Sequence, residues 1–209
     1  MTKRLVLSGG GDFADSIEHH RLFASWLAPK NRLLYIPGGG GLATDGYKWI
    51  TNVFTNFGTF SIQMCDILSG DKPAPRSEYD GIYIGGGNTF TLLDAFRRSF
   101  FDKQLHALAL GGCPIFGGSA GAILLGKDLG TCSHMDPNDV GLKDLSGLDL
   151  INGYAIWCHF EPSLTELVND FVATRKIPVI ALPENAGVVC EGDELRGVGP
   201  GEMGRFVTL

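Results

Sequence analysis

A serine flanked by glycines lies between two apolar runs in the middle of the chain. Cys113-Pro-Ile-Phe leads into Gly117-Gly118-Ser119-Ala120-Gly121, and Ala122-Ile-Leu-Leu follows. This is the pattern G-x-S-x-G between a strand and a helix, in which a sharp turn lifts the serine hydroxyl to its tip. Glycines suit such a turn because the backbones come so close that a Cβ has no room. We interpret Ser119 as a candidate nucleophile; the alternative is a packing turn in which Ser119 only caps the helix.

A serine hydroxyl is a weak nucleophile at neutral pH and needs a general base, for which the sequence offers five histidines. His134 lies in an irregular segment, residues 131–139. His159 directly follows the strand-like residues 154–157 and is expected at a strand's carboxyl end, as Ser119 is. His159 is therefore the candidate base, with a buried structural histidine as the alternative interpretation. The other three fall in helix-like stretches, where surface or packing roles suffice: His19, His20 and His106.

A carboxylate would hold the imidazole of the base in the useful tautomer. Glu184 follows the strand-like residues 179–182, again at a carboxyl end. Asp136 and Asp139 lie between the serine and the histidine in sequence and could fold back over the site. Position favours Glu184 as the third member, with Asp136 as the alternative. The alternative interpretation of each candidate carboxylate is a solvated side chain in a loop, without a catalytic role.

A second strand–turn–helix passage lies upstream of the serine. The apolar residues 81–84 lead into Gly85-Gly86-Gly87-Asn88-Thr89-Phe90. Backbone N–H groups of such a turn can point at developing negative charge, together with the N–H of the residue after the nucleophile. Gly87 and Ala120 are therefore the candidate donors of an oxyanion hole.

Strand-like and helix-like stretches alternate along the chain and must position these turns. The strand-like stretches are apolar runs bounded by Gly, Pro or Asn, namely 4–8, 32–36, 61–67, 81–84, 114–116, 154–157 and 179–182. The helix-like stretches are 14–27, 43–56, 89–96, 104–110 and 164–174, the last with Ser163 and Glu166 as a capping box. Three shorter strand-like segments close the chain, 187–191, 194–197 and 205–209. The predicted fold class is α/β: a doubly wound, mostly parallel sheet with helices on both faces and a short antiparallel C-terminal meander.

Composition and charge exclude several classes of partner. The chain has 209 residues, with 17 Lys and Arg against 23 Asp and Glu, a net charge of −6. This balance argues against a surface that neutralises phosphates, so we expect no nucleic-acid partner. The histidines and cysteines lack ligand spacing, so we expect no metal and no cofactor.

The cysteines and the hydropathy pattern predict a cytoplasmic protein. The five cysteines form no C-x-x-C pair and are odd in number, which favours reduced, buried thiols. The basic N-terminal start precedes too few apolar residues for a signal peptide. No run approaches the roughly 18 apolar residues of a membrane span, so no membrane association is expected.

The two glycine-rich turns together resemble the dipeptidase E and cyanophycinase family of serine peptidases. Gly85-Gly86-Gly87-Asn88-Thr89-Phe90 followed by Gly118-Ser119-Ala120-Gly121-Ala122 carries the resemblance, which extends over most of the chain. It implies a class I glutamine amidotransferase-like fold, as a single domain over residues 1–209, with serine in place of the nucleophilic cysteine. It further implies Ser119 as nucleophile, His159 as base, Gly87 and Ala120 as oxyanion donors, and a small peptide as substrate.

The resemblance leaves the third member and the substrate side chain to be decided. The dipeptidase branch resembles an arrangement with an Asp between nucleophile and histidine, whereas other branches use a Glu like Glu184. The ungapped position for that Asp falls on His134, and a two-residue shift is needed to reach Asp136. This departure favours Glu184 and weakens the expectation of cleavage after aspartate. An acidic substrate would need a cation, for which Lys127, Lys143, Arg175 and Lys176 are the candidates.

A non-enzymatic nucleotide or small-ligand binding module is the alternative from another functional class. Gly9-Gly10-Gly11-Asp12-Phe13-Ala14 matches G-x-G-x-x-A after the first strand. That fingerprint expects an acidic residue at the end of the second strand, about 20 residues on. Here the second strand ends Leu34-Tyr35-Ile36-Pro37-Gly38, without a carboxylate. Residues 37–41 also lack the Gly-Lys-Ser/Thr of a phosphate-binding loop.

Overall fold

Alternating side chains of the central strands show how the main sheet is built. In the computed structural model, which describes residues 2–39 and 41–207, Leu5 and Leu7 face one hydrophobic core while Val6 between them faces another. Leu34 and Ile36 join the first core, and their neighbours Leu33 and Tyr35 join the second. Both faces are therefore covered, as expected for a mostly parallel sheet.

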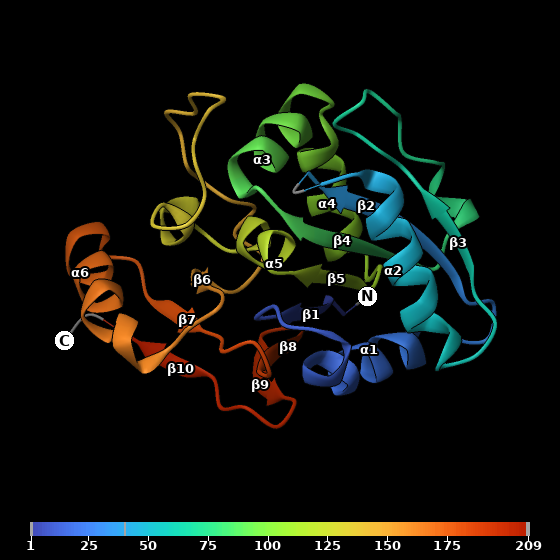
Figure 1. Cartoon of the computed structure of the whole chain (residues 1–209). Helices are drawn as coiled ribbons and strands as arrows, with labels where there is room; N and C mark the ends of the chain where they lie inside the picture. Colours follow the sequence, from blue (N-terminus) through green and yellow to red (C-terminus); the bar gives the residue numbers. More distant parts are fainter. Residues whose placement is uncertain (1, 40, 208–209) are drawn as a thin grey trace.

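Seven strands form this sheet in the order β3-β2-β4-β5-β1-β8-β9. The first five in that order pair in parallel, whereas β8 pairs antiparallel with β1 and β9 antiparallel with β8. Their bounds are β1 (Arg4–Ser8), β2 (Arg32–Gly38), β3 (Ser61–Met64), β4 (Gly81–Gly87), β5 (Ile115–Gly118), β8 (Gly187–Glu191) and β9 (Glu194–Val198). The predicted α/β class with helices on both faces is confirmed (Figure 1).

Helices cover the two faces as separate groups. α1 (Phe13–Leu27) and α2 (Ala43–Thr55) pack on one face, where Phe23 and Phe54 are fully buried. α3 (Thr89–Arg98), α4 (Phe101–Leu110) and α5 (Ala120–Leu125) pack on the other. The predicted helices 14–27, 43–56, 89–96 and 104–110 match α1 to α4, with α3 and α4 longer than expected by a few residues.

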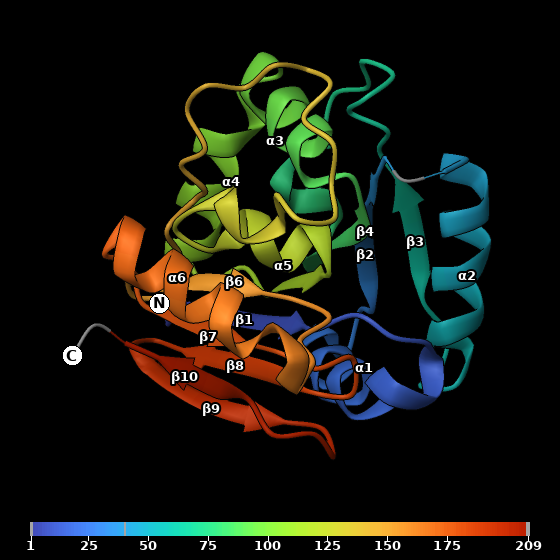
Figure 2. The same cartoon turned by 60° about the vertical axis from the view of Figure 1, so that its left-hand side comes forward.

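Three short strands form a second sheet that the sequence did not separate from the first. β6 (Ala155–Trp157) pairs in parallel with β7 (Val179–Ala181), and β10 (Gly204–Phe206) pairs antiparallel with β7. α6 (Thr165–Arg175) packs against this sheet through Val168 and Val172 (Figure 2). The predicted meander is thus divided: β8 and β9 extend the main sheet, whereas β10 joins the small one. The predicted strand 205–209 runs partly into residues 208–209, which lie outside the described residues.

Helix capping differs from the expectation at one end of the chain. The predicted capping box of Ser163 and Glu166 is wrong, because Pro162–Leu164 forms a 3₁₀ turn and Leu164 takes the N-cap position of α6. A true capping box begins α1, where the Asp12 carboxylate accepts from the Ala14 and Asp15 amides.

In the part of the chain that the structure describes, no helix is both long and apolar enough to cross a bilayer.

Candidate active site

Ser119 occupies a strained turn between β5 and α5. Its backbone φ is +48° and its ψ is −109°, a conformation that L-residues rarely adopt. The flanking glycines are required sterically, since a Cβ at Gly117 would lie 2.7 Å from the Gly121 backbone and one at Gly121 would lie 2.4 Å from Ile84 O. α5 therefore sits directly against β4, and the serine is held at the tip of the turn.

His159 and Glu184 continue from Ser119 in one chain of contacts. Ser119 Oγ lies 2.8 Å from His159 Nε2, and His159 Nδ1 lies 2.9 Å from Glu184 Oε1. The His159 side chain is 31% exposed and that of Glu184 is 57% exposed. One imidazole nitrogen thus faces the hydroxyl and the other faces the carboxylate, the arrangement of a nucleophile, a base and an orienting acid.

The three residues come from two sheets rather than from one edge of a single sheet. His159 and Glu184 follow β6 and β7, which pair in the small sheet, whereas Ser119 follows β5 in the main sheet. A backbone hydrogen bond connects the two parts beside the site: the His159 amide donates to the carbonyl oxygen of Gly9, which follows β1 of the main sheet, at 2.9 Å. His159 and Glu184 thus share one edge of the small sheet, as carboxyl ends of neighbouring parallel strands, whereas Ser119 reaches them from the main sheet.

Asp136 and His134 are held elsewhere. Asp136 Oδ2 accepts from the Thr89 amide at 2.8 Å, which places the carboxylate at the N-terminus of α3. The His134 ring stacks on Trp157 at 4.7 Å between ring centroids. Among the described residues, the side-chain hydrogen bonds of the His159 imidazole go to Ser119 and Glu184 and not to Asp136 or His134. The geometry therefore brings together the serine, the histidine and Glu184 and leaves the alternative third member out.

Comparison with known proteins decides the family. The family model described as Peptidase family S51 matches residues 5–198, nearly the whole chain. The chain belongs to peptidase family S51. Its membership makes it a serine-type peptidase.

Relatives of this S51 peptidase are described as peptidase E. The Streptomyces coelicolor protein is 30% identical over 59% of this chain, and that stretch spans 54% of the relative, about half of its length. The Shewanella denitrificans protein is 28% identical over 88% of this chain and 81% of its own length. A Listeria monocytogenes EGD-e structure, described as a candidate peptidase E, has the same fold with a TM-score of 0.73, covering 96% of this chain and 100% of that one at 19% identity.

The C-terminal end of β4 lies beside the serine of the S51 peptidase. A Cβ added at Gly86 would lie 3.3 Å from Ser119 Cβ and 3.9 Å from Ser119 Oγ, so only a residue without a side chain leaves this space open. Gly87, which follows, lines an adjoining cavity with the end of β2. The Gly86 contact was not predicted from the sequence, which singled out Gly87 and Ala120; the spacing of three glycines does not tell which one touches the serine.

The glycine-rich turn after β1 packs against the site rather than forming a phosphate cradle. A Cβ at Gly9 would lie 2.1 Å from Pro183 O, and one at Gly10 would lie 2.2 Å from His159 Cε1. Asp12 already occupies the Ala14 and Asp15 amides at the start of α1, where a nucleotide phosphate would have to bind. The glycines that resemble a dinucleotide fingerprint thus allow close packing against the candidate site.

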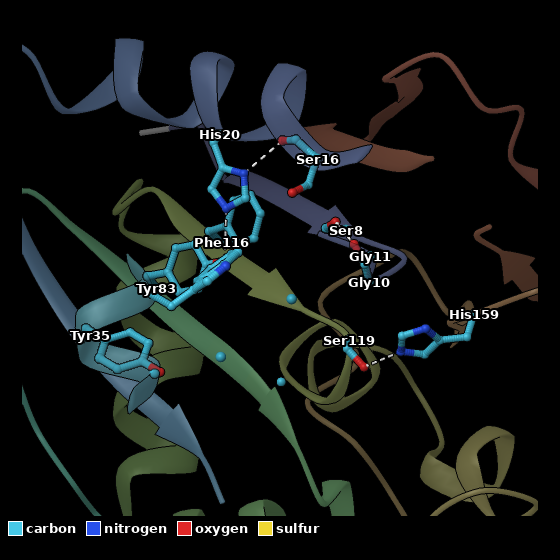
Figure 3. Close-up of a pocket in the computed structure, with 15 residues that line it drawn as sticks. Ser8, Gly10, Gly11, Ser16, His20, Tyr35, Tyr83, Phe116, Ser119 and His159 are labelled. Carbon is cyan, nitrogen blue, oxygen red and sulfur yellow. Dashed lines mark hydrogen bonds between the residues drawn. The ribbon is translucent and has the colours of Figure 1, made fainter. Parts of the chain in front are cut away.

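A cavity of about 240 Å³ opens beside the serine (Figure 3). Ser119 and His159 line one part of it, and buried rings from α1 and the central strands line another. Burial lowers the pKa of His20, one of these rings, to about 4, so its imidazole is neutral at pH 7. The sequence did not assign His20 to a site, because a histidine on a helix face gives no signal of which cavity it borders.

Proposed function

We propose that this S51 peptidase hydrolyses a peptide bond in small peptides through Ser119, His159 and Glu184, by way of an acyl-enzyme. The observation that carries the proposal is the continuous chain of contacts from Ser119 Oγ through the imidazole to Glu184 Oε1, 2.8 and 2.9 Å long. The strained turn at Ser119 supports it, because such conformations cluster at functional sites.

Each group has a defined task in the proposed reaction. Ser119 Oγ attacks the substrate carbonyl carbon while His159 Nε2 takes the hydroxyl proton, and Glu184 stabilises the imidazolium that results. The Gly87 and Ala120 amides are the proposed donors to the oxyanion. His159 then passes the proton to the leaving amine as the C–N bond breaks. In the second half, His159 removes a proton from water, which attacks the acyl carbon. The ester C–O bond then breaks, His159 returns the proton to Ser119 Oγ, and the acid is released.

The proposal also covers the domain organisation of the chain and the compartment in which it works. We propose that residues 1–209 act as a single class I glutamine amidotransferase-like domain and work in the cytoplasm. All five cysteines are free and buried, as suits a reducing compartment. Burial raises the pKa of the Cys113 thiol to about 11 and of the Cys132 thiol to about 12, so these thiols are unreactive at neutral pH.

The proposal is tested on Ser119. A dipeptide and isopeptide library is screened against the native chain and Ser119→Ala in parallel, with Ser163→Ala as the control for loss of an exposed serine hydroxyl. We expect Ser119→Ala to remain folded and to lose roughly 10⁴- to 10⁶-fold in turnover. A fluorophosphonate should add to Ser119, as shown by peptide mass spectrometry. Full activity in Ser119→Ala, or labelling at another residue, would contradict the proposal.

A further inference from the structure

The cavity beside Ser119 identifies a substrate class. We propose that it binds an uncharged aromatic or bulky apolar side chain, carried by the residue whose carbonyl Ser119 attacks, and that it rejects an aspartate side chain at this position. The inference rests on the proposed function, since it assigns the cavity to the acyl side of the bond that Ser119 cleaves.

The floor of the cavity is made of packed rings. Tyr83 and Phe116 stack with their centroids 4.4 Å apart, and His20 stacks on Phe116 at 4.8 Å. Tyr35 lies 6.0 Å from Tyr83 and completes this group. All four side chains are buried and line the cavity. Their rings offer flat, rigid surface on which an aromatic or bulky apolar side chain gains contact.

The position of the rings relative to the base assigns them to the acyl side. His159 gives its proton to the leaving amine, so the leaving half of the substrate lies on the His159 side of Ser119. In Figure 3 the rings of His20, Tyr83 and Phe116 lie on the opposite side of Ser119 from His159. A side chain on the acyl residue therefore points toward the rings.

The polar atoms of the floor are satisfied by one another and carry no charge. His20 Nδ1 lies 2.8 Å from the Ser16 carbonyl, which can only accept, so Nδ1 holds the proton. His20 Nε2 is then free to accept from the Tyr83 hydroxyl, 3.0 Å away. The low pKa of His20 agrees with a neutral ring, and burial raises the pKa of Tyr35 to about 12. Nothing in this network offers a cation to a carboxylate.

The cavity also lacks a charged side chain on its walls. Among the described residues that line it, none is an Asp, Glu, Lys or Arg. Two of the cations that could have received an acidic substrate are paired elsewhere, Lys127 with Asp149 at 3.0 Å and Arg175 with Asp128 at 2.5 Å. An aspartate side chain would lose its hydration here without gaining a partner, which strongly disfavours its binding.

The size of the cavity agrees with a ring-sized occupant. Its volume of about 240 Å³ exceeds that of cavities that hold benzene, which are near 150 Å³. Gly118 leaves part of this room free: a Cβ there would lie 3.6 Å from Tyr83 Oη and 3.7 Å from Phe116 Cε1, in ordinary contact. A methyl group at position 118 would thus narrow the cavity without a clash.

The first test compares side chains on the acyl residue with the leaving residue held constant. Dipeptides Phe-Leu, Leu-Leu, Ala-Leu and Asp-Leu are assayed with the native chain, and we expect kcat/KM for Phe-Leu to exceed that for Asp-Leu by at least about 100-fold. The rate of Ser119 labelling by aminoalkyl phosphonates carrying a benzyl or a carboxymethyl side chain gives the same comparison without turnover. A preference for the acidic side chain in either measurement overturns the inference.

The second test narrows the cavity. Gly118→Ala is compared with Gly197→Ala, where an added Cβ meets nothing within 4 Å. We expect Gly118→Ala to lower the Phe-Leu to Ala-Leu ratio of kcat/KM by about tenfold or more, and Gly197→Ala to leave the ratio unchanged. An unchanged ratio in a folded Gly118→Ala overturns the inference. An S51 peptidase that labels at Ser119 but prefers aspartate refutes the cavity assignment alone, whereas an unlabelled Ser119 and no cleavage refute the proposed function.

Discussion

At the scale of single residues, the candidate site depends on backbone conformations as much as on side-chain chemistry. Ser119 and His159 both have a positive φ, +48° and +51° respectively, although neither is a glycine. Such conformations are strained for these residues and persist only where the surroundings fix them. The surroundings here include glycines: a Cβ at Gly10 would lie 2.2 Å from His159 Cε1, and one at Gly86 would lie 3.3 Å from Ser119 Cβ.

The first prediction separates the two candidate acids. Glu184→Gln replaces the carboxylate beside His159 Nδ1 with an amide that can stabilise the wrong tautomer, so we expect kcat/KM to fall by roughly 10²- to 10⁴-fold. Asp136→Ala removes the acceptor of the Thr89 amide, so we expect a loss of about 1 kcal/mol in the free energy of unfolding with little change in kcat/KM. Steady-state kinetics and urea denaturation measure the two effects, and the opposite ranking in kcat/KM would assign the role to Asp136.

A parallel pair of histidine substitutions tests the identity of the base. His159→Gln keeps a polar side chain but cannot accept and return the Ser119 proton, so we expect turnover and fluorophosphonate labelling to fall together, by at least about 10³-fold. His134→Gln, which removes a ring stacked on Trp157, should affect stability rather than turnover. Loss of labelling in His134→Gln but not in His159→Gln would identify the other histidine as the base.

At the scale of elements, the turn after β1 holds the histidine in place. The sequence drew attention to these glycines through a dinucleotide-like pattern, whereas the structure uses Gly9 and Gly10 to let the two sheets touch at Pro183 and His159. A local pattern shows that a turn needs glycine but not which distant segment comes close to it. The capping box at Asp12 was not predicted, because its third helical residue is the aspartate Asp15, where the common pattern has a glutamate.

A matched pair of glycine substitutions tests this role. Gly10 has φ +126° and Gly58 has φ +129°, so alanine suffers similar backbone strain at both positions. A Cβ at Gly10 would lie 2.2 Å from His159 Cε1, whereas a Cβ at Gly58 meets nothing within 4 Å. We expect Gly10→Ala to lower kcat by about 100-fold or more through displacement of the imidazole, and Gly58→Ala to lower stability without such a loss. Similar kcat values in the two variants would show that the turn does not position the base.

At the scale of the whole molecule, strand positions were predictable but sheet membership was not. The apolar runs at 154–157 and 179–182 did form β6 and β7, yet they pair with each other, and β7 with β10, instead of joining the main sheet. Each has three residues buried on both faces, and such short apolar runs carry no information about their partners. The candidate residues His159 and Glu184 come together all the same, because a polar residue after an apolar run reaches a carboxyl end whichever sheet contains the strand.

Burial of α1 against the sheet makes the stability of the molecule depend on pH. His19 and His20 are both buried, and desolvation lowers the pKa of each; that of His20 falls to about 4 from its ordinary 6.5. Between these two values the unfolded chain binds a proton at His20 that the folded chain does not. The free energy of unfolding therefore decreases as pH falls through 6.5, and the His20 contribution is fully lost below about pH 4.

Denaturation at several pH values checks this expectation. The His20 shift corresponds to about 3 kcal/mol between pH 7 and pH 4, and His19 adds to it with the same sign. We expect His20→Gln to be less stable at pH 7, because it loses the contacts with Ser16 and Tyr83, but to lose less further stability on acidification. His106→Gln is the matched control on an exposed helix position and should keep the pH dependence of the native chain. If His20→Gln and His106→Gln showed the same slope between pH 7 and 4, the buried imidazole would not be the group that links protons to folding; a flatter slope in His20→Gln alone means that the neutral ring beneath the candidate active site is maintained by the fold.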